Sequence, residues 1–179
     1  VPANTIVAGN PAKVIRKITE EDIAQYKQEL AKEQNSTLSE KDKMEQGYWY
    51  NTFDTELIKL RQQNAPKTEA YSRISANTLC YKDKMAKAII NNFGENANII
   101  PPFTCTYGNN VSIGEATIIN HNGVFIDSNK INVGAHALIG PKSLLNCSFR
   151  PYDIDDRNNG IAKTSAINIG DGAWLGGRV

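Results

Sequence analysis

The sequence predicts a mainly β fold, a parallel solenoid built from six-residue repeats, with a small α-helical domain. The first observation is a series of pairs in which an aliphatic or aromatic residue precedes glycine: Tyr107-Gly108, Ile113-Gly114, Val133-Gly134, Ile139-Gly140, Ile169-Gly170 and Leu175-Gly176. The second is that apolar residues continue this register without glycine, at Ile119, Phe125 and Leu145. A repeat this short cannot hold a pair of helices, so each is expected to form one short strand and a turn.

The physical basis of such a repeat is one inward side chain per strand. Each apolar residue is expected to stack on its equivalents in the coils above and below, which buries a continuous column. The glycine beside it permits a tight corner, where a Cβ atom would clash or strain the backbone. Three repeats are then expected to close one triangular coil.

The helical domain is predicted from capping residues and apolar spacing. Thr19 and Asp22 have the spacing of a capping box, and Asp54 can cap the helix that follows it. Gly47 and Gly94 are suited to end helices. The expected helices cover residues 19–32, 39–46, 55–62 and 82–92, and the solenoid is expected to start near Ile99.

Two irregularities interrupt the repeat. From Phe125 to Val133 the spacing is eight residues, so a bulge or a widened corner is expected around 128–130. Between Leu145 and Ile169 the register is kept, but three inward positions are not apolar: Pro151, Arg157 and Lys163. This stretch is therefore expected to loop out, and long loops on rigid frameworks often carry function.

Composition sets the broad class of the protein. The chain has 179 residues, of which 40% are hydrophobic and 22% are charged, which suits one compact unit with a small appendage. A net charge of +1 provides no field that would attract nucleic acid or an acidic membrane surface. No apolar run approaches the roughly 20 residues of a membrane helix, and no signal peptide opens the chain. A cytoplasmic protein is expected.

Cysteine and histidine give no sign of a metal site. Cys80, Cys105 and Cys147 are odd in number and lack paired metal spacing, so reduced thiols with structural roles are expected. A zinc centre with three histidines would need one more than His121 and His136.

Three stretches carry a resemblance to a known family. Between residues 101 and 179 the motifs are Pro101-Pro102-Phe103, Tyr107-Gly108, Asn120, Ile139-Gly140-Pro141 and Trp174-Leu175-Gly176-Gly177. An earlier stretch carries Met44, Gly47, Trp49-Tyr50, Asp54 and Glu56-Leu57-Ile58, and the opening reads Val1-Pro2-Ala3-Asn4 through Gly9-Asn10-Pro11-Ala12-Lys13-Val14-Ile15. The chain resembles the hexapeptide-repeat sugar O-acetyltransferases of the maltose and galactoside acetyltransferase type. The resemblance implies a left-handed parallel β-helix.

The segments stand in an unexpected order. In the family, the segment that resembles residues 1–18 comes last, after further solenoid, so part of the solenoid is expected to be missing here. Two explanations stay open: a rearranged chain with its termini moved into the solenoid, or a fusion of the tail of one copy to the body of another. The expected domains are a family C-terminal-type segment (1–18), a helix and linker (19–38), a maltose-acetyltransferase-type helical cap (39–94) and the hexapeptide-repeat β-helix (95–179).

The resemblance also implies a function. The family uses acetyl-CoA to acetylate a hydroxyl of a sugar such as maltose, glucose or a galactoside, by direct transfer without a covalent acetyl-enzyme. Such a transfer needs a general base for the hydroxyl and donors for the tetrahedral oxyanion. The resemblance implies a homotrimer, with each active site between neighbouring subunits.

Arg150 occupies the position of the family's catalytic histidine. Arginine keeps its proton and presents only donors, so it cannot accept the proton of the sugar hydroxyl, although it can hold an oxyanion or a phosphate. An alternative function is therefore a catalytically impaired or silent trimeric scaffold. His121, beside Asn120, is a possible substitute base, but a solvated or packed histidine explains it as well, and His136 is expected in an exposed turn.

The resemblance assigns the remaining site residues. The expected acceptor-binding residues are Asn120, Asp127, Asn51 and Asp54. The expected coenzyme-binding residues are Trp174, Gly176, Gly177, Lys13 and Arg16. Simpler roles stay open for some of them: a solenoid corner for Asn120, a helix cap for Asp54, packing for Trp174 and a solvated surface for Lys13 and Arg16.

Overall fold

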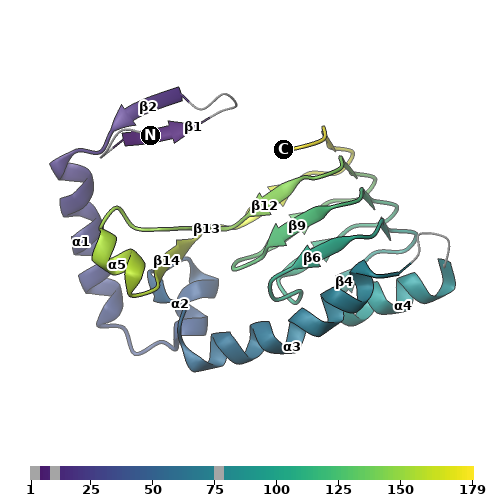
Figure 1. Ribbon diagram of the computed structural model, residues 1–179, viewed down its shortest axis with the longest axis horizontal. Coiled ribbons are helices and arrows are strands. Elements are labelled where there is room, and N and C mark those ends of the chain that lie inside the picture. The colour runs from purple at the N-terminus through teal and green to yellow at the C-terminus, as the bar shows by residue number, and fades with distance from the viewer. Residues whose placement is uncertain (1–4, 9–12, 75–78) are drawn as a thin grey trace.

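The computed structural model describes residues 5–8, 13–74 and 79–179. Its central feature is a parallel β-helix made of three stacks of short strands (Figure 1). The first stack consists of β4 (Asn92–Phe93), β7 (Val111–Ile113), β10 (Ile131–Val133) and β15 (Ile167–Ile169). The second consists of β5 (Asn98–Ile99), β8 (Ile118–Ile119), β11 (Leu138–Ile139) and β16 (Trp174–Leu175). The third consists of β6 (Phe103–Cys105), β9 (Gly123–Ile126) and β12 (Leu144–Asn146).

The inward columns confirm the predicted solenoid. Ile113, Ile119 and Ile139 are each at most 3% exposed, and Ile169 is partly buried against the same core. Within the stacks, Ile119 pairs with Ile139, and Phe125 pairs with Leu145. One apolar side chain per strand therefore builds the core without long-range sheet topology.

The length of the coil differs from the prediction. Phe93 pairs with Ile113 and Ile113 with Val133, so successive coils are 20 residues apart rather than three six-residue repeats. The longer step after Phe125 is therefore not a single irregularity, because an equal step precedes Ile113. Tyr107, assigned to the repeat, instead packs in a separate cluster with residues of the helical part. The extra residues form a wide corner, in which the Asp127 carboxylate binds backbone amides of the preceding coil.

The repeated glycines are required by close contact between coils. A Cβ atom on Gly114 would lie 2.4 Å from the backbone nitrogen of Ala135 in the next coil, and Gly94 and Gly134 are equally crowded. Positive φ angles occur two residues later, at Ala116 (51°) and His136 (55°). Glycine therefore lets successive coils approach each other, while its neighbours make the turn.

The first two helices begin where the capping signals predict, and the second also ends there, whereas the first continues two residues beyond the predicted residue 32. Helix α1 (Glu20–Gln34) has Thr19 as its N-cap and Asp22 completing a capping box. Helix α2 (Glu40–Gln46) ends at Gly47, which has a φ of 76° and donates its amide to the last turn.

Helix α3 (Thr55–Ser72) is longer than predicted. It continues past Gln62 and includes Pro66, which the sequence pattern alone does not favour within a helix. Its second half is held against the solenoid, where the buried Asn64 side chain donates to the carbonyl of Cys105. Tertiary contact therefore extends this helix beyond its local signals.

Helix α4 (Leu79–Ile89) ends before the predicted residue 92 because Asn92 and Phe93 form the first solenoid strand. The first strand of the solenoid thus lies before Ile99, near which the solenoid was predicted to start. Helices α3 and α4 lie across the end at which the solenoid starts (Figure 1). Tyr71 of α3, Ala86 of α4 and Ile90, which follows α4, are buried in the same core.

The stretch predicted to loop out leaves the solenoid after β12 and returns at β15. It contains β13 (Ser148–Phe149), α5 (Ile154–Asn158) and β14 (Ile161–Thr164). Strand β14 pairs antiparallel with β13 and with β3 (Tyr50–Asn51) of the helical part. The excursion loop, defined as residues 147–165, is therefore anchored to the helical part.

At the start of the chain, β1 (Thr5–Ala8) and β2 (Lys13–Lys17) pair antiparallel. Part of the predicted tail-type segment, residues 1–4 and 9–12, lies outside the described residues. The altered segment order and the domain boundaries stay predictions. Among the helices that the structure describes, none has the length and apolar character needed to cross a bilayer.

Two of the three cysteines are described at the side-chain level. Cys105 and Cys147 are buried and unpaired, as expected for reduced thiols, whereas the side chain of Cys80 lies outside the described residues. Burial raises the pKa of the Cys105 thiol to about 12, so this group is held in the unreactive protonated form.

The coil-to-coil contact predicts a large effect for one glycine of a column and almost none for another. Gly114→Ala should lower the free energy of unfolding by about 2 kcal/mol, because the new methyl group meets backbone atoms that cannot move aside. Gly170→Ala should change it by less than about 0.5 kcal/mol, since no atom lies within 4 Å of the new Cβ. Urea denaturation of both variants measures the difference, and equal effects would contradict the stacking argument.

Candidate functional site

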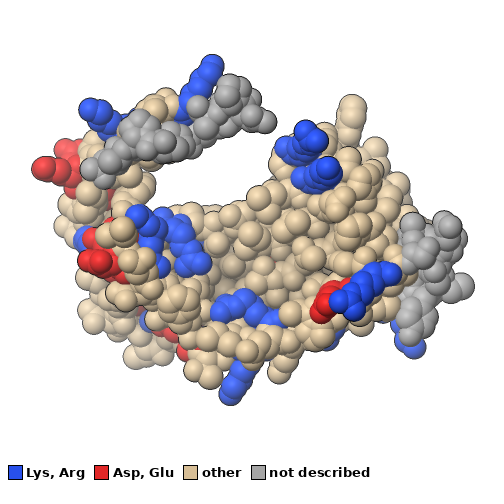
Figure 2. Space-filling model, in the orientation of Figure 1, with Lys and Arg blue, Asp and Glu red and all other residues tan. Residues whose placement is uncertain are grey.

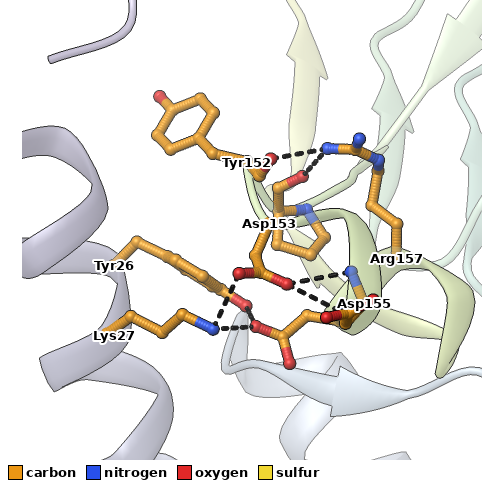
Figure 3. A network of polar contacts seen from close by, with 8 residues as sticks. Tyr26, Lys27, Tyr152, Asp153, Asp155 and Arg157 are labelled. Carbon is orange, nitrogen blue, oxygen red and sulfur yellow. Dashed lines mark hydrogen bonds and ion pairs between the residues drawn. The ribbon is translucent and has the colours of Figure 1, made fainter. Parts of the chain in front are cut away.

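The excursion loop is tied to helix α1 by a polar network (Figure 3). The Tyr26 hydroxyl donates to the Asp156 carboxylate. The Lys27 ammonium lies 2.7 Å from Asp156 and 3.1 Å from Asp153. Asp153 also accepts from the amides of Asp155 and Asp156, which caps α5. Helix α1 and the excursion loop therefore form one structural unit.

An aromatic pocket of about 210 Å³ lies between α1 and the excursion loop. The rings of Tyr26 and Trp49 meet edge to face with centroids 4.8 Å apart, and Phe149 lies 5.7 Å from Trp49 in the same manner. Tyr152 lies 6.5 Å from Tyr26. The other lining residues are Asp22, Gln25, Glu29, Arg150, Pro151 and Lys163. We call this cavity the aromatic pocket.

Most charges of the aromatic pocket are paired. Asp22 accepts two hydrogen bonds from Arg16, which holds the pKa of Asp22 well below its usual range. Glu29 lies 2.9 Å from Lys163, and this contact is the main cause that lowers the pKa of Glu29. Both carboxylates are therefore ionised and neutralised near pH 7.

Arg150 is placed at the aromatic pocket and has only neutral acceptors. One terminal nitrogen lies 3.4 Å from the Thr52 hydroxyl and 3.4 Å from the carbonyls of Gly160 and Ile161. Among the described residues, no carboxylate lies within ion-pair distance of this guanidinium. Arg150 can bind an anion but cannot accept a proton, and its catalytic role stays a prediction.

A second pocket, of about 340 Å³, lies on the solenoid corner between the second and third stacks. It is lined by His121, Pro141, Lys142, Gly177 and Arg178. Figure 2 shows a hollow between α1 and the solenoid, with basic side chains on both sides of it. We call the second cavity the corner pocket.

Sequence reasoning missed the two cations of the corner pocket. Lys142 and Arg178 adopt positive φ angles of 61° and 62°, and Asn122 (61°) occupies the same place in the coil below them. Each lies three residues after an inward residue of the second stack, namely Ile119, Ile139 or Leu175. This equal spacing in the sequence could have predicted that Lys142 and Arg178 are neighbours. Non-glycine residues with positive φ are uncommon, which marks this corner as a constrained one.

Asn120 and His121 form an oriented pair at the same corner. The Asn120 side-chain oxygen accepts from the backbone amide of His121 at 2.8 Å and lies 2.7 Å from His121 Nδ1. Because this oxygen only accepts, the neutral tautomer that suits the contact carries its proton on Nδ1 and leaves the lone pair on Nε2. His136, by contrast, is exposed and lines neither pocket.

Asp127 is fully buried in the wide corner after β9. Its carboxylate accepts from the backbone amides of Thr106, Tyr107 and Gly108 at 2.7–2.9 Å. Burial raises the pKa of Asp127, and these amides oppose that effect. The carboxylate fastens two coils together, which explains the eight-residue step; its role in acceptor binding stays a prediction.

Asn51 and Asp54 lie at the start of α3. The Asn51 side chain accepts from the amide of Phe53 at 2.8 Å, while Asp54 caps α3 by accepting from the amides of Glu56 and Leu57. The capping role that the sequence left open for Asp54 is therefore present. Acceptor binding by either residue stays a prediction.

The expected coenzyme residues are not gathered at one place. Trp174 is 80% exposed on the outer face of β16, and Gly177 lines the corner pocket next to the exposed Gly176. Lys13 is exposed on β2, whereas Arg16 is bound to Asp22. The structure thus brings Gly177 to the corner of Asn120, and it places Arg150 in the other pocket.

No metal centre is formed by the part of the chain that the structure describes. Within it, no group of three histidine, cysteine, aspartate or glutamate side chains is arranged to hold an ion.

Sequence comparisons find named acetyltransferases. The Saccharomyces cerevisiae protein YJL218W, named an acetyltransferase, is 31% identical over 127 residues, which cover 71% of this chain and 65% of that protein. This chain therefore spans less than two thirds of that relative. The Dictyostelium discoideum protein DDB_G0275913, also named an acetyltransferase, is 31% identical over 143 residues, 80% of this chain and 74% of that protein. No protein-family model matches the sequence.

Solved structures give the same result. A maltose O-acetyltransferase from Clostridium difficile 630 superposes with a TM-score of 0.75 at 27% identity, covering 79% of this chain and 75% of that one. The hexapeptide-repeat acetyltransferase VCA0836 from Vibrio cholerae, complexed with acetyl coenzyme A, superposes with a TM-score of 0.70 at 27% identity, over 78% of this chain and 75% of that one.

The contact between α1 and the excursion loop should weaken in acid. The amide of Asp156 and then Lys27 lower the pKa of Asp153, so its stabilising effect is complete above the ordinary pKa of aspartate and is lost as the pH falls through the lowered value. We expect Lys27→Met to lower the melting temperature at pH 7 and to have a smaller effect at pH 3. Thermal melts of both proteins at the two pH values measure this. An equal difference at both values would exclude the ion pairs as the cause.

Proposed function

Since this chain belongs to the hexapeptide-repeat sugar O-acetyltransferases, which have a left-handed parallel β-helix, we propose that it transfers an acetyl group from acetyl-CoA to a hydroxyl of a sugar. Maltose, glucose and galactosides are the first acceptors to test. Direct transfer in a ternary complex is the proposed mechanism. A cytoplasmic location is proposed with it, because the described thiols Cys105 and Cys147 are unpaired.

The corner pocket is the observation that best supports this function. It combines the glycine-lined wall at Gly177 with two cations, Lys142 and Arg178, whose positions are fixed by the solenoid register. Coenzyme A carries several phosphate groups, and lysine and arginine bind phosphate by charge-assisted hydrogen bonds. Glycine permits the close approach of a ligand to the backbone. We propose that acetyl-CoA binds along this corner, with Gly176 and Trp174 beside it.

The proposed general base is His121. Direct transfer requires a group that accepts the proton of the acceptor hydroxyl, and Arg150 presents donors only. His121 lines the corner pocket, and the contact with the Asn120 oxygen favours the neutral tautomer that leaves Nε2 unprotonated. A base oriented by a neighbouring side chain is a common arrangement in acyl transfer. In this proposal Arg150 contacts the acceptor and not the transferred proton.

The outer faces of the solenoid support a homotrimer. The second stack exposes Ile118, Leu138 and Trp174 in one column, and the third exposes Val124 and Leu144. The first stack instead presents a polar row, in which Asn132 donates to Asn168 at 2.8 Å. Two different apolar faces on one subunit suit a head-to-tail ring, in which one face of each subunit meets the other face of the next.

A catalytically silent binding relative is the second candidate, and Arg150 is the observation that favours it. The guanidinium stands where the family has its catalytic histidine, and the excursion loop, which the structure describes in full, contains no histidine. Such a protein would keep the fold and the trimer without acetyl transfer, and an Arg150→His variant without activity or coenzyme binding would support it.

Acetyl transfer by two variants separates these candidates. His121→Gln should lower kcat by about 100-fold or more while coenzyme binding is kept, because the base is lost and the cations remain. Transfer to glucose or maltose is followed by the release of coenzyme A, with binding measured by calorimetry. An active wild type with unchanged His121→Gln activity would refute this base. An inactive wild type with a large gain in Arg150→His would identify an impaired enzyme.

The proposed trimer can be broken from one face. Leu138→Asp should reduce the molar mass from three chains to one, because it places a charge in the apolar column of the second stack. Asn132→Asp changes an exposed residue of the polar row in the neighbouring stack and should leave the mass unchanged. Light scattering after size exclusion gives both masses. A monomeric wild type, or equal effects of the two changes, would refute the proposed interface.

A further inference from the structure

The aromatic pocket has features that the proposed acetyl transfer does not explain. One of its walls is α1, which lies in the stretch 19–38 that none of the family motifs covers. Its opposite wall is the excursion loop, held in place by the network of Tyr26, Lys27 and Asp156. The pocket is therefore a built feature of this chain and its ligand can be inferred from its lining.

The size and the rings of the pocket suit a single small ring. Its volume of about 210 Å³ is below the roughly 300–1,000 Å³ of pockets for drug-sized ligands. The aromatic side chains give it apolar walls, against which the C–H face of a pyranose can pack, while the lining also includes polar groups that can bind hydroxyls.

One buried donor in the pocket has no acceptor. Trp49 is 5% exposed, and its indole Nε1 is a buried group without a hydrogen-bond partner among the described residues. A weak hydrogen-bonding interaction with the Trp49 side chain is the last of the causes that lower the pKa of Glu29, so the indole points toward that carboxylate, although no hydrogen bond of normal geometry joins the two. A hydroxyl accepts and donates at once, so a sugar hydroxyl can accept from Trp49 and donate to Glu29. An unpartnered buried donor is costly, and such a ligand would remove that cost.

The charges of the pocket specify a second feature of the ligand. Asp22 is neutralised by Arg16, and Glu29 by Lys163. Arg150 is the remaining lining cation, and its contacts are three neutral oxygens at 3.4 Å. A planar guanidinium binds carboxylate or phosphate oxygens in a bidentate manner. The unpaired charge therefore favours a ligand that carries an anion.

We propose that the aromatic pocket binds one pyranose ring that carries an anionic group, with Arg150 on the anion and Trp49 and Glu29 on a hydroxyl. A hexuronic acid and a sugar phosphate share this chemistry. The inference deepens the proposed function, since it names the acceptor class, and it rests on that function only for the step from binding to acetylation.

Calorimetry on the full chain tests the binding step. The probes are D-glucuronate, D-glucose 6-phosphate, D-glucose and benzoate, at one low salt concentration. At least one anionic sugar should bind about tenfold or more tightly than glucose, because one charge-assisted contact is added. If glucuronate binds more tightly than glucose 6-phosphate, the preferred anion is a carboxylate, and in the opposite case it is a phosphate. Benzoate has the charge without hydroxyls and should bind more weakly than glucuronate. Equal binding of glucose and both anionic sugars would overturn the proposal.

Matched variants test the assigned contacts. Arg150→Gln should reduce binding of the anionic sugar to the level of glucose, whereas Arg178→Gln removes the same charge from the corner pocket and should leave this binding unchanged. Trp49→Phe keeps a ring and deletes the N–H. It should weaken sugar binding several-fold, while the smaller ring also lowers the melting temperature of the free protein through lost packing with Tyr26. Anionic-sugar binding that survives Arg150→Gln would overturn the assignment.

Acetyl transfer to the same sugars separates the inference from the proposed function. If the protein acetylates glucose but neither binds nor acetylates either anionic sugar, the acceptor class is refuted and the proposed function stays in place. Binding of glucuronate that depends on Arg150, without any transfer at saturating acetyl-CoA, would support the site and refute the function.

Discussion

The structure depends on the packing of one coil directly on the next. Neighbouring strands lie about 4.8 Å apart, so each inward side chain must stack on the equivalent side chain of the next coil. At the crowded corner only glycine, which has no side chain, fits between the coils. Ile119 and Ile139 meet the first requirement, and Gly114 meets the second. Because successive coils are 20 residues apart, except where the excursion loop is inserted, every position is placed above an equivalent one. A residue that is unremarkable by itself, such as Lys142, then gains a defined neighbour in Arg178.

The same constraint explains how a long loop can be inserted. The amide of Ser165 donates to the carbonyl of Cys147, and the amide of Ile167 donates to the carbonyl of Lys130, so the loop leaves and returns at neighbouring points of the stack. The inward column continues across it from Val133 to Ile169. The loop is therefore free to differ in sequence without disturbing the core, and its conformation is set by contacts with α1 and β3 instead.

The features that could be predicted from the sequence are those that depend on residues close together in the chain. The inward column and the helix caps at Thr19 and Gly47 were predicted because each depends on residues a few positions apart. The coil length was not, because it depends on Asp127 binding amides about 20 residues earlier in the chain. The aromatic pocket was not predicted either, since it joins Tyr26 to Tyr152 through tertiary contacts that leave no periodic pattern.

The two apolar faces and the corner pocket are connected by geometry. The second and third stacks meet along the corner that carries His121, Lys142 and Arg178, so the two faces that expose Leu138 and Leu144 adjoin that corner. If one face covers the other face of a neighbouring subunit, the corner lies at the edge of the interface. A coenzyme bound along the corner then contacts two chains, so assembly and coenzyme binding stabilise each other by mass action. The polar row of the first stack stays in water, because Asn132 and its partner satisfy each other there.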